Sequence, residues 1–179
     1  RAIAAGVKCI EHGHLMDEPT ARLIAEKGIW LSTQAFPDEL ADAFPPGSLE
    51  RAKASEVFAG TDRTFALAKK YKIKTAWGTD ILFSQRLAQR QGELLAKLIR
   101  WYTPAETLVM ATGTNAQLLE LSRKRNPYPG KLGVVEEGAL ADLLLVDGNP
   151  LENIELIADP GTNFVVIMKD GKVYKNALK

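Results

Sequence analysis

Apolar and polar positions follow two alternating patterns over the first hundred residues. Three runs rich in β-forming residues predict strands, at residues 7–10, 29–36 and 73–78. Helical spacing of apolar residues predicts helices at about residues 17–28, 49–70 and 86–102, whereas the proline-rich stretch 37–48 is expected to be a loop. Strands that alternate with helices are typical of parallel βα units, so an α/β fold is expected.

The pattern changes after residue 122. Thr103-Pro104 predicts the start of a further helix pair that runs to Leu121. The basic, Pro/Gly-containing junction "RKRNPYPGK" follows, and the remaining apolar runs are short and separated by turn signals. The Asp170-Gly171 pair, flanked by apolar alternation, predicts an antiparallel hairpin. We therefore expect one part of the protein over residues 1–122 and a second, antiparallel β part over 123–179.

Composition narrows the class of partner. The chain is 46% hydrophobic and 25% charged, as in ordinary globular proteins, and its net charge of +1 does not favour nucleic acid or an acidic membrane surface. Its apolar runs are shorter than the roughly 18 residues that a membrane span needs. The single cysteine, Cys9, predicts a reducing compartment or a secreted protein without disulfides, with the cytoplasm as default. The start "RAIAAG" reads as the end of a helix, which predicts further sequence upstream.

Candidate chemistry lies at two predicted strand ends. The first strand is followed by Glu11, His12 and His14, and the third by Asp80. Functional groups of parallel βα folds gather at such ends, and imidazole and carboxylate are both zinc ligands. A carboxylate there can also act as a general base. Equally, a histidine at a strand end is often only hydrogen-bonded, and an aspartate after Gly-Thr is often a helix cap or turn residue.

Several motifs together resemble a known family. The segments "AIAAGVKCIEHGHLMDE", "KTAWGTD", "TPAETLVMATGTNAQLLEL" and "GKLGVVEEGALADLLLVDGNPLENI", with "VVIMKDGKVYKN" near the end, occur in the order found in the C-terminal half of metal-dependent amidohydrolases. The nearest group resembles the imidazolonepropionase-related hydrolases, which include Xaa-Pro and Xaa-Arg dipeptidases and carboxypeptidases. The most specific parts are "IEHG" with "GTD" at the right distance and the tail from Gly133 to Asp147.

The resemblance implies a fold and roles for two residues. The fold would be a partial (β/α)8 TIM barrel, strands 6 to 8 with their helices, plus the C-terminal β segment of a small β-sandwich domain. His12 would be a metal ligand at the end of strand 6, and Asp80 a metal ligand and the general base at the end of strand 8. His14 has no fixed role in the family pattern and is only a candidate substrate-pocket residue. A match of "HGH" to the family's strand 1 pair is disfavoured, because 68 residues (80 minus 12) hold about two βα units rather than seven.

The implied activity is hydrolysis of an amide or peptide bond, dipeptidase- or carboxypeptidase-like, with one or two zinc ions. The family's other metal-binding residues would lie upstream, so the missing N-terminal half of the same enzyme is the expected partner, and the 179 residues alone are expected to be inactive. A small molecule or dipeptide is the expected substrate, the segment 36–49 is a candidate lid over it, and a homo-oligomer is compatible. Two alternatives stay open: a deaminase or cyclic-amide hydrolase, and a non-catalytic βα module or pseudo-enzyme subunit.

Overall fold

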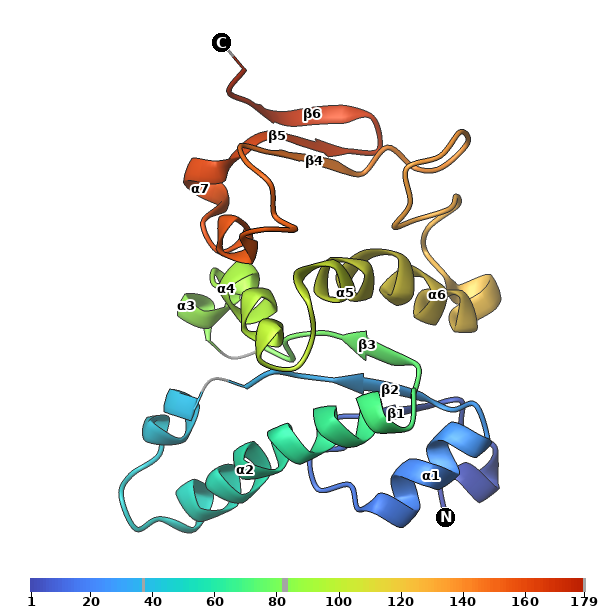
Figure 1. Ribbon diagram of the computed structural model, residues 1–179, viewed down its shortest axis with the longest axis vertical. Coiled ribbons are helices and arrows are strands. Elements are labelled where there is room, and N and C mark those ends of the chain that lie inside the picture. The colour runs from blue at the N-terminus through green and yellow to red at the C-terminus, as the bar shows by residue number, and fades with distance from the viewer. Residues whose placement is uncertain (37, 82–83, 179) are drawn as a thin grey trace. The chain divides into compact units, whose positions relative to one another are not determined.

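The computed structural model describes residues 1–36, 38–81 and 84–178. The chain divides into two units, Arg1–Asp80 and Ile81–Lys179, and each unit contains a three-stranded sheet (Figure 1). One sheet is parallel and the other antiparallel, so the α/β class is confirmed. The division after residue 122 that the sequence suggests stays a prediction.

The first unit is built on three short parallel strands in the order β1-β2-β3. They are β1 (Cys9–Glu11), β2 (Trp30–Thr33) and β3 (Thr75–Trp77). In register, Ile10 is paired with Leu31, and Leu31 with Thr75. All three strands therefore end at the same edge of the sheet; the first and third end within one residue of the expected positions, whereas the second ends at Thr33, three residues earlier than expected.

Two helices connect these strands. Helix α1, Glu18–Glu26, begins where the Asp17 side chain accepts a hydrogen bond from the amide of Thr20 at 2.9 Å. Helix α2, Leu49–Lys70, has the bounds expected from its apolar spacing and is capped by Ser48. The two helices and the sheet enclose one apolar core, made of Met16, Ala21, Ile24, Ile29, Leu31, Leu67, Ala68 and Ile73.

Two short 3₁₀ helices complete this unit. The first, η1, covers Ile3–Ala5 and ends at Gly6, which has a φ of 90° as expected of a glycine that closes a helical turn. The second, η2, covers Asp38–Ala43, within a stretch expected to be loop. The guanidinium of Arg51 pairs with Asp42 and donates to the carbonyl of Phe44 at 3.3 Å, which ties this segment to α2. Its role as a lid stays a prediction.

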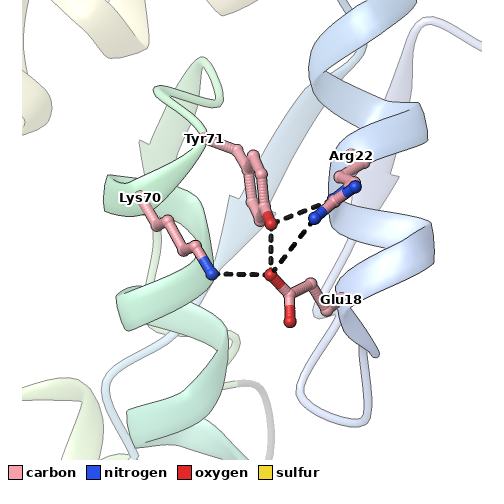
Figure 2. Close-up of polar contacts among 4 residues, drawn as sticks. All are labelled: Glu18, Arg22, Lys70 and Tyr71. Carbon is pink, nitrogen blue, oxygen red and sulfur yellow. Dashed lines mark hydrogen bonds and ion pairs between the residues drawn. The ribbon is translucent and has the colours of Figure 1, made fainter.

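A polar cluster joins α1 to the end of α2 (Figure 2). The carboxylate of Glu18 accepts hydrogen bonds from Lys70 Nζ at 2.6 Å and from the hydroxyl of Tyr71. Arg22 Nε donates to the same hydroxyl at 3.1 Å. The hydrogen bond from Lys70 and that from Tyr71 hold the pKa of Glu18 below its usual value. Because the cluster is exposed, it contributes mainly to the alignment of the two helices.

The second unit begins with a helix that is broken where one continuous helix was expected. The expectation of a single helix over residues 86–102 was wrong: α3 covers Gln85–Ala88, α4 covers Gln91–Ala96, and the 3₁₀ helix η3 covers Lys97–Arg100. The break falls at Arg90, whose φ of −100° and ψ of 28° leave the helical region. Directly after it, Gly92 packs against the carbonyl of Ile157, where a Cβ would lie 2.0 Å from the oxygen.

The helical segment that follows is continuous as far as Ser122, and the backbone leaves the helical conformation at Arg123, where φ is 50°. Helix α5, Pro104–Val109, begins with a capping box in which Thr103 and Glu106 satisfy each other's backbone amides. It passes through a π-helical turn, Met110–Thr114, labelled η4, into α6, Asn115–Leu119, and then into η5, a 3₁₀ segment at Glu120–Arg125. Instead of the helix pair expected up to Leu121, Thr114 and Asn115 are therefore the joint between two turns of one helical segment.

The C-terminal sheet is antiparallel in the order β4-β5-β6, with bounds β4 Leu143–Val146, β5 Phe164–Lys169 and β6 Lys172–Asn176. Between β4 and β5 lie η6, Ile154–Ile157, and α7, Pro160–Asn163. Strands β5 and β6 meet at Asp170-Gly171, both with positive φ, so the hairpin expected there is confirmed.

None of the described helices is both long and apolar enough to cross a bilayer.

Candidate functional site

The ends of β1 and β3 bring together two residues that the sequence singled out. His12 Nδ1 lies 3.7 Å from Asp80 Oδ2, and both side chains are about half exposed, 54% and 41%. Each residue has a positive φ, 68° for His12 and 52° for Asp80. The left-handed conformation costs a residue with a Cβ on the order of 1–2 kcal/mol, and such residues gather at functional sites. The backbone at both strand ends is thus held in a form that aims these side chains at each other.

The backbone beside His12 is fixed by hydrogen bonds from neighbouring elements. The amide of His12 donates to the carbonyl of Ser32 at 2.7 Å, and the hydroxyl of Thr33 donates to the carbonyl of His12 at 2.7 Å. From α2, the hydroxyl of Thr64 donates to the carbonyl of Gly13 at 3.0 Å. These bonds satisfy a chain segment that has left the sheet, so its geometry does not depend on solvent.

A third residue of the site was missed by the sequence reasoning. Gln34 follows β2 and places its side-chain Oε1 3.0 Å from His12 Nδ1. Gln34 is buried, at 4% exposure. The three consecutive strands therefore each contribute one residue, and we call His12, Gln34 and Asp80 the strand-end cluster. No clear signal for Gln34 was present in the sequence, because the strand predicted over residues 29–36 included it, whereas β2 ends at Thr33 and leaves Gln34 at the same edge as the other two.

His14 lies behind this cluster. Its Nε2 is 3.1 Å from the backbone carbonyl of Gln34, and its ring stacks on that of Phe36 with centroids 4.9 Å apart. Burial lowers the pKa of His14, although the hydrogen bond to the carbonyl acts in the opposite sense. The ring is therefore neutral near pH 7, with Nε2 as the donor. His14 is only 3% exposed to solvent, so these contacts are all with other parts of the protein.

A cavity of about 320 Å³ opens beside His12, lined by His12, Gly13, His14, Leu15, Met16 and Val57. Its wall is almost entirely apolar. An apolar wall beside the His12 side chain suits a ligand with an apolar part next to a polar reacting group.

The donor set fits part of a zinc site. Imidazole nitrogen and carboxylate oxygen are both zinc ligands, and the side chains of His12 and Asp80 approach each other to 3.7 Å. Over residues 1–36, 38–81 and 84–178, no group of three or more His, Cys, Asp or Glu side chains could hold a metal ion. Glu11 does not join the pair; its carboxylate accepts from the thiol of Cys9 at 3.4 Å. These residues thus supply two ligands, where a catalytic zinc ordinarily has three from protein.

Comparison with known proteins gives a consistent result. The model of a family described as the amidohydrolase family matches residues 1–175. Ochratoxinase of Aspergillus niger is 28% identical over 184 aligned residues, which cover 97% of this chain and 35% of the ochratoxinase. The chain thus spans about a third of the length of this curated relative.

Solved structures agree. The crystal structure of an amidohydrolase superposes with a TM-score of 0.84 at 30% identity and covers 99% of this chain and 42% of the other. The crystal structure of a prolidase complexed with N-methylphosphonate-L-proline gives a TM-score of 0.82 at 29% identity, covering 98% of this chain and 42% of the other.

Proposed function

The chain belongs to the amidohydrolase family, and we propose that it forms the part of a metal-dependent hydrolase that supplies His12 and Asp80 to the active site. The observation that carries the proposal is the convergence of these two side chains from the ends of β1 and β3 in left-handed backbone conformations. In this proposal β1, β2 and β3 are strands 6 to 8 of a (β/α)8 barrel. Residues 1–122 then form the barrel part, and residues 123–179 form the β segment of a small sandwich domain.

The proposed reaction is hydrolysis of an amide or peptide bond. Asp80 accepts a proton from the attacking water and passes it to the leaving amine, as a half-exposed carboxylate at the mouth of a site can do. His12 and Asp80 would hold the metal, one or two zinc ions in the complete enzyme. When bound, zinc supplies a nucleophile at neutral pH and polarises the scissile carbonyl.

The substrate class we propose is a dipeptide or a similar small amide. The prolidase among the solved structures binds a phosphonate derivative of proline, and the cavity beside His12 offers an apolar wall next to the reacting groups. His14 lines this cavity, so a substrate contact through its ring edge is retained as part of the proposal. The remaining ligands come from the rest of the polypeptide, and the 179 residues alone are proposed to be inactive.

The test uses the full-length protein, purified with its metal, and a panel of dipeptides. Metal content is measured by plasma mass spectrometry. Removal of zinc by a chelator is expected to abolish hydrolysis, and its return to restore it. Asp80→Asn is expected to lower kcat by about 10²- to 10⁴-fold, the usual contribution of a positioned base.

The matched control is Asp170→Asn. Asp170 is also exposed and has a φ of 49°, but it lies in the β5–β6 turn. Asparagine tolerates this backbone conformation, so the control is expected to keep full activity. Protein that binds no metal and hydrolyses no amide, or an Asp80→Asn variant as active as the control, would favour the non-catalytic module instead. Release of ammonia from a deamination substrate would support the alternative reaction within the same family.

A further inference from the structure

We propose that Gln34 is a positioning residue, whose side-chain amide sets the orientation and tautomer of the His12 imidazole. The inference deepens the proposed function, because its consequence for catalysis depends on His12 acting there. The inference rests on the hydrogen bond between Gln34 Oε1 and His12 Nδ1, whose two atoms lie 3.0 Å apart.

The surroundings of Nδ1 determine where the ring proton lies. Two oxygens face this nitrogen, Oε1 of Gln34 at 3.0 Å and Oδ2 of Asp80 at 3.7 Å. Both oxygens accept hydrogen bonds, so Nδ1 carries the proton and Nε2 keeps its lone pair. Only the glutamine oxygen lies within hydrogen-bond distance; the carboxylate adds an electrostatic preference in the same direction. The ring of His12 is thus presented with Nε2 as its basic atom.

Gln34 can impose this orientation because it is itself enclosed by the protein. It is buried, at 4% exposure, while the side chain of His12 is 54% exposed. The backbone carbonyl of Gln34 accepts a hydrogen bond from Nε2 of His14 at 3.1 Å. His14 is in turn held by stacking on Phe36. The buried histidine therefore fixes the backbone of Gln34, and the glutamine side chain fixes the exposed histidine.

The hydrogen bond to Gln34 determines the direction in which the free nitrogen of the His12 ring points. A ring held at one nitrogen presents the other in a single direction, whereas a free ring of this exposure samples several rotamers and both tautomers. Partners of this kind usually change metal affinity or activity by about 10- to 100-fold when they are removed. Gln34 is placed to act in this way without touching the reacting atoms.

The test is a tautomer measurement by NMR on the full-length protein labelled with ¹⁵N-histidine. The protein is studied metal-free, because a metal on Nε2 would fix the tautomer by itself. The His12 signals are identified by their loss in a His12→Gln variant. We expect the wild type to show the Nδ1-protonated tautomer, Gln34→Leu to lose this preference, and Gln34→Glu, which keeps an acceptor oxygen, to restore it.

Two further variants complete the design. Gln34→Asn preserves the amide but shortens the side chain by one carbon, so it is expected to lose the preference even if Gln34→Leu does not fold. Gln117→Leu, at an exposed position of α6, is the matched control and should leave the His12 signals unchanged. A His12 tautomer that is unaltered in folded Gln34→Leu or Gln34→Asn protein would overturn the inference.

Hydrolysis by the zinc-loaded variants separates this inference from the proposed function. Gln34→Leu is expected to lower kcat by about 10-fold or more with a smaller change in KM, and Gln34→Glu to recover part of the loss. If the protein hydrolyses no amide, the tautomer shift in Gln34→Leu still supports the positioning role. If it does hydrolyse amides but the tautomer is unaffected, the proposed function stands and the role of Gln34 fails.

Discussion

Replacing Gly60 with alanine tests how closely α2 must approach the segment that carries His12. Gly60 is buried in α2, the long helix of the first unit (Figure 1). A Cβ built on it would lie 1.9 Å from the backbone oxygen of His14 and 2.9 Å from its carbonyl carbon. Ordinary van der Waals contact begins at 3.4 Å, so the two backbones would have to separate by about 1.5 Å.

Two opposing terms set the size of the effect. Alanine is favoured over glycine within a helix by about 1 kcal/mol. Overpacking of a tightly packed site usually costs about 1–3 kcal/mol, and the cost here should lie at or above the upper end because the obstacle is backbone rather than a movable side chain. We therefore expect Gly60→Ala to lower the free energy of unfolding by about 2 kcal/mol. For a domain of about 150–250 residues that corresponds to a fall in Tm of about 4–8 °C, and a smaller fall is expected in the longer full-length protein.

The assay is thermal and urea unfolding of the full-length protein, with Ser55→Ala as control at an exposed position of the same helix. The control should be neutral or slightly stabilising, because it adds helix propensity without a contact. The same Gly60→Ala protein should show altered His12 NMR signals, since the shift reaches the residues next to His14. Gly60→Ala protein as stable as the control would refute the argument that this contact is close.

Three further predictions concern other regions. The hydrogen bond from Lys70 lowers the pKa of Glu18 in the folded protein. The stabilisation by the ionised carboxylate is therefore present above its unfolded pKa and is lost as pH falls through its folded pKa. In calorimetry, the Tm of the wild type should thus fall more than the Tm of Glu18→Gln between about pH 5 and pH 3. Burial, reinforced by the nearby charge of Glu11, raises the pKa of Cys9 to about 12. Iodoacetamide at pH 8 should therefore modify Cys9 more than about 100-fold slower than a free thiol, as followed by mass spectrometry. Unfolding in urea should remove this difference in rate. Gly171→Ala should lower the free energy of unfolding by about 1 kcal/mol because φ is 73°, whereas Gly78→Ala, with open space and no positive φ, should cost less in the same urea titration.

Much of the secondary structure could be predicted because its signals are local. The side chains of Asp17 and Ser48 each accept a hydrogen bond from the backbone amide three residues later and so cap the helix that follows, and the apolar spacing of residues 49–70 defines a helix whose observed bounds agree. The Asp170-Gly171 pair accepts positive φ at both positions and closes the hairpin. Each of these interactions joins residues close in sequence, so no knowledge of the rest of the fold is needed.

The broken helix at residues 86–102 shows the limit of local signals. Its apolar stripe is continuous in sequence, and three leucines of the stripe, Leu94, Leu95 and Leu98, are indeed buried. The break after Ala88 coincides with a place where Gly92 meets the backbone of Ile157, 65 residues away (157 minus 92). A contact at that distance leaves no trace in helical periodicity.

The candidate site divides in the same way. By itself the sequence determined that His12 and Asp80 follow strands of a βα protein, and the resemblance of its motifs indicated the family that the comparisons confirm. Only the tertiary structure decided that Gln34 contacts His12 and that His14 is buried behind it. The reason is physical. Local signals depend on backbone conformation within a few residues. Hydrogen bonds between strand ends depend instead on the order and register of the three parallel strands, and that order and register are set by side chains far apart in the sequence.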